Sequence, residues 1–230
     1  MNCAFERWLT KLASVFVAIP VKELSESKTR LSSILSLEER KNLVSVMLSD
    51  VLNAVTQTSL VNRILVVSPN ADSLVSLCHQ MIEIIEEVDC QGLNPALKIA
   101  VDYAVQKAAG SLLILPADIP LIDRSDVELI IRASSNDGVV IVPSRDEMGT
   151  NALMLTPPNI IPTTFGPNSF QSHLNLAESH KRSTRILRLE RVSLDIDTPD
   201  HLREFLSFPV PSGTRDYLFK ISLTDRIRRL

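Results

Sequence analysis

The chain has 230 residues, of which 45% are hydrophobic and 4% aromatic, and its formal net charge at pH 7 is −3. This length suits one α/β domain with at most a small appendage, and the weak acidic charge with few aromatic residues argues against a nucleic-acid-binding surface. Three cysteines, Cys3, Cys78 and Cys90, form no CxxC pair, so we expect no disulfide framework or zinc site and a reducing, cytoplasmic location.

The N-terminal segment could be read as a targeting signal. Arg7 and Lys11 precede an apolar stretch, residues 12–21, but no small-x-small cleavage site follows it. The stretch is also too short to span a bilayer, so we expect no membrane attachment. We interpret residues 1–14 as an N-terminal extension and Ser14–Pro20, which is β-branched and continuously apolar, as the first core strand.

A polar loop, residues 21–31, follows this strand and carries three cations, Lys22, Lys28 and Arg30. Such cations lower the cost of bringing phosphate groups together, although a solvated surface loop is the commoner fate of lysine and arginine. The loop has no glycine, so it is neither a Walker A motif nor a Rossmann fingerprint. Side chains must therefore do more of any phosphate binding than backbone amides.

The next stretch alternates helices with strands. Ser36–Glu39 reads as a capping box that opens a long helix, whose apolar stripe continues to Val55. We expect strands over residues 63–68 and 82–88 and a short helix over residues 71–79 between them.

A further helix is predicted to start at Asn94, as N-cap, with Pro95 in the first position, and to end before Gly110. The free amides at this helix start could bind a base or a ribose, and a simple helix cap explains the same residues.

The stretch Leu112–Leu115 is a continuous apolar run, which is typical of a strand buried on both faces. Asp118 follows it between Pro116 and Pro120, which stop the strand and stiffen the turn. In open α/β sheets ligands bind at the carboxyl ends of strands, where a carboxylate can hold a divalent cation beside a phosphate. On position alone, an aspartate that only stabilises the turn is an equal alternative.

Beyond Asp118, Ser125–Glu128 reads as a second capping box, with strands expected over residues 138–142 and 152–156. Phe170–Glu178 has a helical pattern that places Ser169 at a helix N-terminus, a natural site for an anion. His173 lies on the first turn, where it could touch an anion or serve a structural role.

A strand is expected over residues 185–189, followed by Asp195 and Asp197, which alternate with apolar residues. On a strand the two carboxylates would face the same side, where they repel unless a cation lies between them. The alternative is that Asp197 caps the next helix and Asp195 lies on the surface. That helix ends near Leu206, and residues 207–230, with an apolar-alternating segment over 217–223, would be an arm that packs on the domain or on a second subunit.

Several of these motifs, in the same order, resemble the 2-phospho-L-lactate guanylyltransferase family, which acts in deazaflavin coenzyme F-420 biosynthesis in archaea and some bacteria. The resemblance covers about residues 15–206. It is carried by P-x-K at 20–22, K-T-R-L at 28–31, G-L-N-x-A-L at 92–97, L-P-A-D-I-P-L at 115–121, G-T-N-A-L at 149–153, F-G-x-x-S-F-x-x-H at 165–173 and L-D-I-D-T-P at 194–199.

The resemblance implies a three-layer α/β/α nucleotidyltransferase domain over residues 15–206, with a mixed, mostly parallel sheet. It implies that GTP and 2-phospho-L-lactate, phosphoenolpyruvate or 3-phosphoglycerate react to give a diphosphoguanosine and pyrophosphate, in a homodimer. Implied site residues are Asp118, Asp195 and Asp197 for Mg²⁺; Pro20, Lys22, Lys28, Gly92, Leu93 and Asn94 for the nucleotide; Thr150, Gly166 and Ser169 for the phosphorylated acid; and Asp118, Lys28 and Arg30 for catalysis.

The residues are consistent with this chemistry, because a phosphate oxygen is already ionised and needs no general base. We hypothesise that Lys28 or Arg30 neutralises the triphosphate. Two alternatives remain at this point: a related nucleotidyltransferase acting on a sugar phosphate or a pterin cofactor, and a non-catalytic nucleotide-binding regulator, which the glycine-free loop supports.

Overall fold

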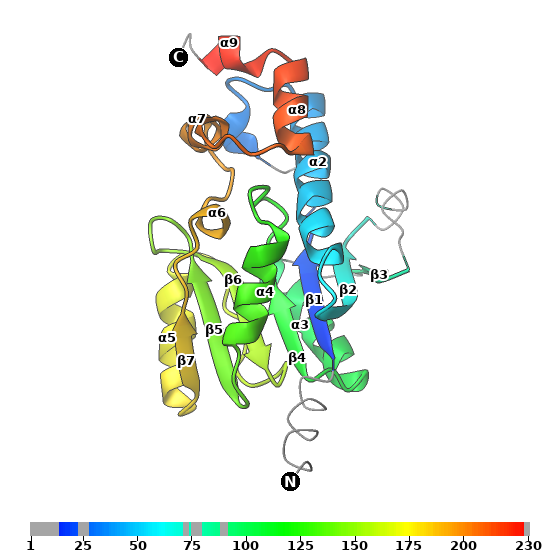
Figure 1. The fold of residues 1–230 in the computed structure, drawn as a ribbon, viewed down its shortest axis with the longest axis vertical. Helices are drawn as coiled ribbons and strands as arrows, with labels where there is room; N and C mark the ends of the chain where they lie inside the picture. Colours follow the sequence, from blue (N-terminus) through cyan, green and yellow to red (C-terminus); the bar gives the residue numbers. More distant parts are fainter. Residues whose placement is uncertain (1–13, 23–27, 71–73, 75–79, 88–91, 228–230) are drawn as a thin grey trace.

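The computed structural model describes residues 14–22, 28–70, 74, 80–87 and 92–227. Within them the strands form one sheet in the order β3-β2-β1-β4-β6-β5-β7 (Figure 1). Only β6 runs antiparallel to its neighbours among these pairings. The expected mixed, mostly parallel sheet is therefore confirmed. The strands are β1 Val15–Pro20, β2 Val61–Ser68, β3 Ile82–Glu86, β4 Ser111–Ile114, β5 Gly138–Pro143, β6 Thr150–Thr156 and β7 Ser183–Ile186.

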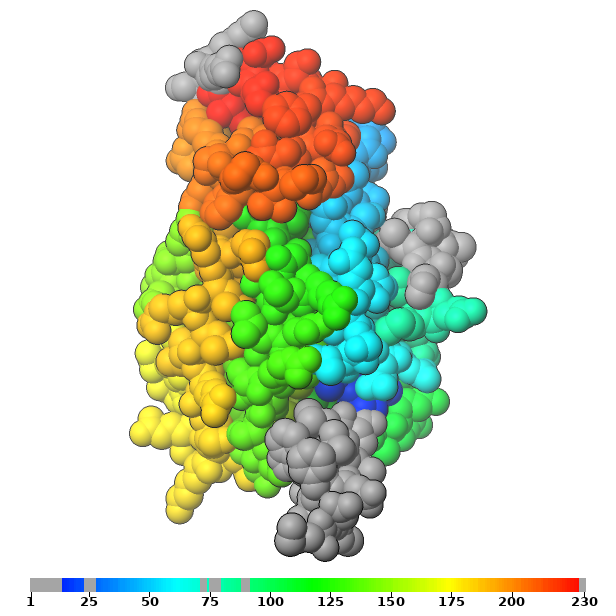
Figure 2. Space-filling view, in the orientation of Figure 1, coloured from blue at the N-terminus to red at the C-terminus, as the bar shows by residue number. Residues whose placement is uncertain are grey.

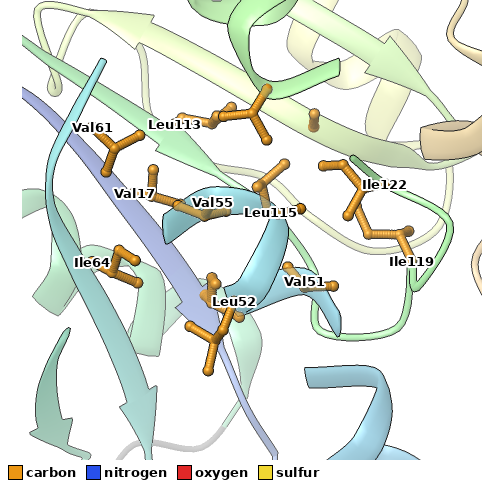
Figure 3. Packing of buried hydrophobic residues seen from close by; sticks show 14 of the residues in the cluster. Val17, Val51, Leu52, Val55, Val61, Ile64, Leu113, Leu115, Ile119 and Ile122 are labelled. Carbon is orange, nitrogen blue, oxygen red and sulfur yellow. The ribbon is translucent and has the colours of Figure 1, made fainter. Parts of the chain in front are cut away.

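Helices cover both faces of the sheet, which confirms the three-layer α/β/α arrangement. Alternate residues of β1 face opposite layers: Val17 packs with α2 (Leu37–Thr56) and α4 (Arg124–Ala133), and Phe16 packs with α3 (Leu93–Gln106) and α5 (Ser169–Ser179). Figure 3 shows side chains of α2 between β1, β2 and the segment that follows β4. The residues of α2 labelled there are Val51, Leu52 and Val55.

One of the two predicted capping boxes is present in the structure and the other is not. The capping box at Ser36 is present, with its hydroxyl accepting from the amide of Glu39. The predicted box at Ser125 is wrong, because Asp123 is the N-cap and Asp126 completes the box. Asp123, two residues upstream, starts the helix earlier: it accepts from the amide of Asp126 and from the hydroxyl of Ser125, which then lies inside the first turn.

The predicted bounds of α3 are also wrong. Gly92, not Asn94, is the N-cap, and the helix ends at Gln106 rather than before Gly110. Gly92 has φ of +116°, a conformation that favours glycine. Asn94 therefore lies inside the first turn, where its side chain is free to bond to another segment.

A third hydrophobic cluster lies beyond the carboxyl ends of β1 and β4. It joins the short helix η2 (Thr29–Leu31) and the start of α2 to α7 (Pro199–Ser207), α8 (Gly213–Lys220) and α9 (Leu223–Ile227). Figures 1 and 2 show these C-terminal helices together at one end of the molecule. The alternating segment 217–223 of the predicted arm thus begins in α8, which packs on α2 of the same chain.

Some predictions fall outside the described residues: the N-terminal extension up to residue 13, the helix over 71–79 apart from residue 74, and the three cysteines. In the part of the chain that the structure describes, no helix is both long enough and apolar enough to cross a membrane.

Candidate functional site

Asp118 lies just beyond the carboxyl end of β4, in the turn that the two prolines frame. Its backbone carbonyl accepts from the amide of Ile196, at 2.9 Å. This bond joins the turn to the segment that carries Asp195 and Asp197, more than seventy positions away in the sequence. This backbone hydrogen bond therefore holds the turn that carries Asp118 beside the segment that carries Asp195 and Asp197.

The segment with Asp195 and Asp197 is not a strand, which corrects the sequence prediction. It follows the short helix α6 (Glu190–Ser193) and leads to Thr198, whose hydroxyl caps α7, so Asp197 is not the N-cap either. The predicted alternation nevertheless holds, because Leu194 and Ile196 are buried in the third hydrophobic cluster, the one formed with the C-terminal helices and called the C-terminal cluster below. An extended chain needs no sheet partner to alternate its side chains.

Three carboxylates meet at this place. Asp118, Asp195 and Asp197 each offer an oxygen atom, and these oxygens lie within 4.8 Å of one another. Burial, followed by the charge of Asp118, raises the pKa of Asp195. Clustered carboxylate oxygens of this kind are the hard ligands that Mg²⁺ prefers, so the residues fit a divalent cation.

Lys28 reaches into the same cluster from the loop after β1. Its ammonium donates to Asp118 Oδ2 and, at 2.6 Å, to Asp197 Oδ1, and its side chain is only 7% exposed. Burial alone would lower the pKa of Lys28, but the two carboxylates outweigh it and the pKa is raised. Burial likewise opposes ionisation of Asp197, yet the charge of Lys28 keeps the pKa of that carboxyl below its usual value.

The backbone of Lys28 is unusual, with φ of +57° in the left-handed region. A non-glycine residue in that region costs of the order of 1 kcal/mol, and such residues gather at functional sites. Here the conformation turns the chain into η2, whose Leu31 is fully buried in the C-terminal cluster.

A cavity of about 350 Å³ opens beside the carboxylates. It brings together seven of the residues predicted from the sequence: Pro20, Lys22, Lys28, Arg30, Leu93, Asp118 and Asp197. Val21, Thr29, Val44, Ile114, Pro116, Ala117 and Phe165 complete its wall. The wall of the cavity thus combines cations, carboxylates and apolar side chains, which suits a nucleotide.

The residues expected to hold a phosphorylated acid lie outside the wall of this cavity. Thr150 and Ser169 are buried, and Gly166, with φ of +130°, is exposed. The carbonyl of Gly166 accepts from the amide of Ser169 at 3.1 Å, so these two residues belong to one turn at the start of α5. Asn168 is the N-cap of that helix.

His173 is structural rather than anion-binding in this arrangement. It is fully buried, Thr164 N donates to its Nε2 at 3.1 Å, and its Nδ1 lies 3.0 Å from Thr150 Oγ1. Since Nε2 accepts, the proton must be on Nδ1, which donates to Thr150. Burial lowers the pKa of His173 to about 4.

Two residues of the site received no role from the sequence. Asn151 donates through Nδ2 to Asp195 Oδ1 at 3.0 Å and to the carbonyls of Val192 and Ser193. A polar amide opening an otherwise apolar strand was the available signal. Phe165 lines the cavity, and although it opens the motif at 165–173, only its tertiary position shows that it does so.

The comparisons with known proteins agree with the geometry. The sequence model of the family described as "Guanylyl transferase CofC like" matches residues 15–229. A phosphoenolpyruvate guanylyltransferase of Sphaerobacter thermophilus is 34% identical over 83% of this chain and 92% of its own. A 2-phospho-L-lactate guanylyltransferase of Methanobrevibacter smithii is 33% identical over 91% of each chain.

Solved structures share the fold at low identity. A protein assigned as a nucleotide-diphospho-sugar transferase, from Desulfovibrio desulfuricans, superposes with a TM-score of 0.74 at 17% identity over 94% of this chain and 97% of its own. A CMP:2-keto-3-deoxy-manno-octonic acid synthetase superposes with a TM-score of 0.55 at 12% identity, over 84% of this chain and 96% of its own. The chain belongs to the guanylyl transferase CofC-like family, which confirms the family resemblance seen in its motifs.

Proposed function

We propose that this family member is a guanylyltransferase of deazaflavin coenzyme F-420 biosynthesis. It joins GTP to a small phosphorylated acid, either 2-phospho-L-lactate or phosphoenolpyruvate, with 3-phosphoglycerate as a third candidate. The names of the relatives support guanylyl transfer and the first two acids. The observation that carries the proposal is the cavity with Lys28, Asp118 and Asp197 on its wall, since two polyanions must meet there.

The reaction is a substitution at phosphorus. A phosphate oxygen of the acid attacks the α-phosphorus of GTP, a new P–O bond forms, and the bond to the β-phosphate oxygen breaks as pyrophosphate leaves. No proton has to be removed from an ionised phosphate, so the site needs no general base. Among the described residues, His173 is the histidine bonded to the loop before α5, and both of its ring nitrogens are already engaged, with Thr150 and Thr164.

Asp118, Asp195 and Asp197 would hold Mg²⁺, which when bound neutralises phosphate charge and orients the two substrates. We assign Lys28 and Arg30 to the triphosphate, with Pro20, Lys22 and Leu93 along the nucleotide. Gly92 supports that side by starting α3. We assign Gly166 and Ser169, which share the turn at the start of α5, to the acid, together with Thr150 at the start of β6, which is bonded to His173 of that helix.

In the structure Lys28 bonds to one oxygen of each of two carboxylates, Asp118 and Asp197, that would hold the cation. A divalent cation and the ammonium therefore compete for Asp118 and Asp197. With a cation held by the carboxylates, Lys28 would be available to the cavity that it already lines, where the triphosphate needs a positive charge. The same lysine would thus serve the carboxylates in one state and the substrate in the other.

The test is an assay of pyrophosphate release with GTP, CTP and ATP, each offered with the three acids and with a sugar phosphate. We expect release with GTP and one acid. Asp118→Asn should abolish turnover while leaving the circular dichroism spectrum and the thermal unfolding midpoint close to those of the parent. Release with a sugar phosphate but none of the acids would contradict the proposal, as would full activity of Asp118→Asn.

A further inference from the structure

We propose that Asn94 is a positioning residue for the acid-binding loop, although the turn that carries it belongs to the nucleotide side. The inference rests on the proposed function, because it takes residues 164–169 as part of the acid site. It goes beyond that function by giving Asn94 a partner and a task that the sequence motif does not imply.

The contact is a two-point clamp on backbone. Asn94 Nδ2 donates to the carbonyl of Phe165 at 2.8 Å, and Asn94 Oδ1 accepts from the amide of Phe165 at 2.7 Å. Both polar groups of one peptide-like side chain are thus bonded to both polar groups of one residue. The two residues lie 71 positions apart, in the first turn of α3 and in the loop before α5.

The loop is clamped from its other side by α5. His173 Nε2 accepts from the amide of Thr164, and the Phe165 ring packs edge-on against the His173 ring with centroids 4.9 Å apart. His173 is also bonded to Thr150, which we assign to the acid. A continuous chain of contacts therefore joins Asn94 through Phe165 and His173 to the acid site.

Ile160 and Ile161 are buried in the core, but the part of the loop next to Phe165 has fewer constraints on its shape. Residues 157–168 contain no helix or strand, and Gly166 next to Phe165 has φ of +130°. A Cβ at Gly166 would meet no atom within 4 Å, so packing against neighbouring atoms does not fix the position of the chain there. Without Asn94, the amide and carbonyl of Phe165 would lose their partners, and the adjacent Gly166 would be less well positioned for the acid.

Asn94 is less suited to reading the base. It is not among the residues that line the cavity, whereas its neighbour Leu93 is. The edge of the Asn94 amide that presents a donor beside an acceptor is already used on Phe165, so a bidentate contact with a base would have to break the clamp. We therefore expect its loss to weaken acid binding more than nucleotide binding.

Asn94→Ala, with Asn175→Ala as the matched control, tests this. Asn175 is an exposed asparagine on α5 whose side chain accepts from Gln171. Two lost hydrogen bonds predict that the KM for the acid rises roughly 5- to 30-fold in Asn94→Ala, while the KM for GTP changes less than about twofold. Calorimetric binding of each substrate alone should show the same split, and the control should match the parent.

Asn94→Asp provides a second variant. It keeps the acceptor for the Phe165 amide but places a carboxylate oxygen against the Phe165 carbonyl, so it should weaken acid binding at least as much as alanine does. Circular dichroism and the unfolding midpoint report whether both variants fold, and a variant that does not fold is replaced by the other in the comparison.

Three outcomes would overturn the role of Asn94. These are a KM for GTP that rises as much as that of the acid, an unchanged KM for the acid, and an Asn94→Asp variant that binds the acid like the parent. A parent protein that binds the acid but releases no pyrophosphate would contradict the proposed function alone, since the binding comparison still tests Asn94.

Discussion

Replacing Lys28 by methionine should make the protein bind Mg²⁺ more tightly while slowing its reaction. The substitution keeps an unbranched side chain of similar length and removes the ammonium. In the parent, that ammonium bonds to two of the three carboxylates, so a cation must first displace it. The variant leaves all three carboxylates without this competitor.

The size of the effect follows from the geometry. Two unit charges about 4 Å apart interact by about 4 kcal/mol at an effective dielectric constant of about 20. The side chain of Asp197 is 41% exposed and that of Asp118 24%, so solvent screening reduces this by about half, to roughly 2 kcal/mol. That corresponds to about 30-fold tighter binding of Mg²⁺. Turnover should fall by about 100-fold or more, because a cation facing the triphosphate is lost.

Titration calorimetry with Mg²⁺ in the absence of nucleotide measures the affinity directly. Thermal unfolding gives a second readout, since the metal-free variant has uncompensated carboxylates and should gain more in Tm from Mg²⁺ than the parent does. Lys98→Met is the matched control, because the side chain of Lys98 is 71% exposed on α3, paired with Asp102. Unchanged or weaker Mg²⁺ binding by Lys28→Met would refute the competition between lysine and metal.

Three further predictions concern single residues. Asn151→Ala frees Asp195 from its amide and should weaken Mg²⁺ binding roughly 10- to 100-fold by calorimetry; unchanged affinity would contradict a positioning role. The pKa of His173 is lowered to about 4, so its imidazole is neutral in the folded protein at neutral pH. Below about pH 6.5 the unfolded chain binds more protons than the folded one, so the free energy of unfolding should fall by about 3 kcal/mol in total between pH 6.5 and pH 4. Denaturant titrations of His173→Gln at several pH values should lack this contribution to the pH dependence. Asp50 accepts from the amides of Gly213 and Thr214 at the start of α8, so Asp50→Ala should cost about 1–2 kcal/mol in urea unfolding, whereas no loss would mean that this cap is not needed.

Signals between near neighbours in the sequence were sufficient to predict several of the helices and strands. Apolar runs predicted β1 and β4, and the stripe from Leu43 to Val55 predicted the buried face of α2, because periodicity depends only on near neighbours. The same reading placed Asp118 at a strand end. It also found Asp195 and Asp197 on one side of the chain, although it took an extended segment for a strand.

Local signals failed where two residues competed for one role. Asp123 and Ser125 both suit a helix start, and so do Gly92 and Asn94; in each case the earlier residue is the cap. Because Gly92 is the N-cap, the side chain of Asn94 does not cap the helix and instead binds the backbone of Phe165. The family resemblance placed Asn94 beside the nucleotide but could not name this partner.

Which side chains meet in the site depends on how the strands and helices are arranged in the fold. Lys28 lies 90 positions from Asp118 and 169 from Asp197, and these three come together because β1 and β4 are neighbours in the sheet and α6 returns the chain to the same edge. The distance along a sequence carries no information about strand order, and an ion pair needs both partners placed within a few ångströms. The chemical types in the site were therefore readable from the sequence, whereas the pairing of Lys28 with the carboxylates became visible only in the fold.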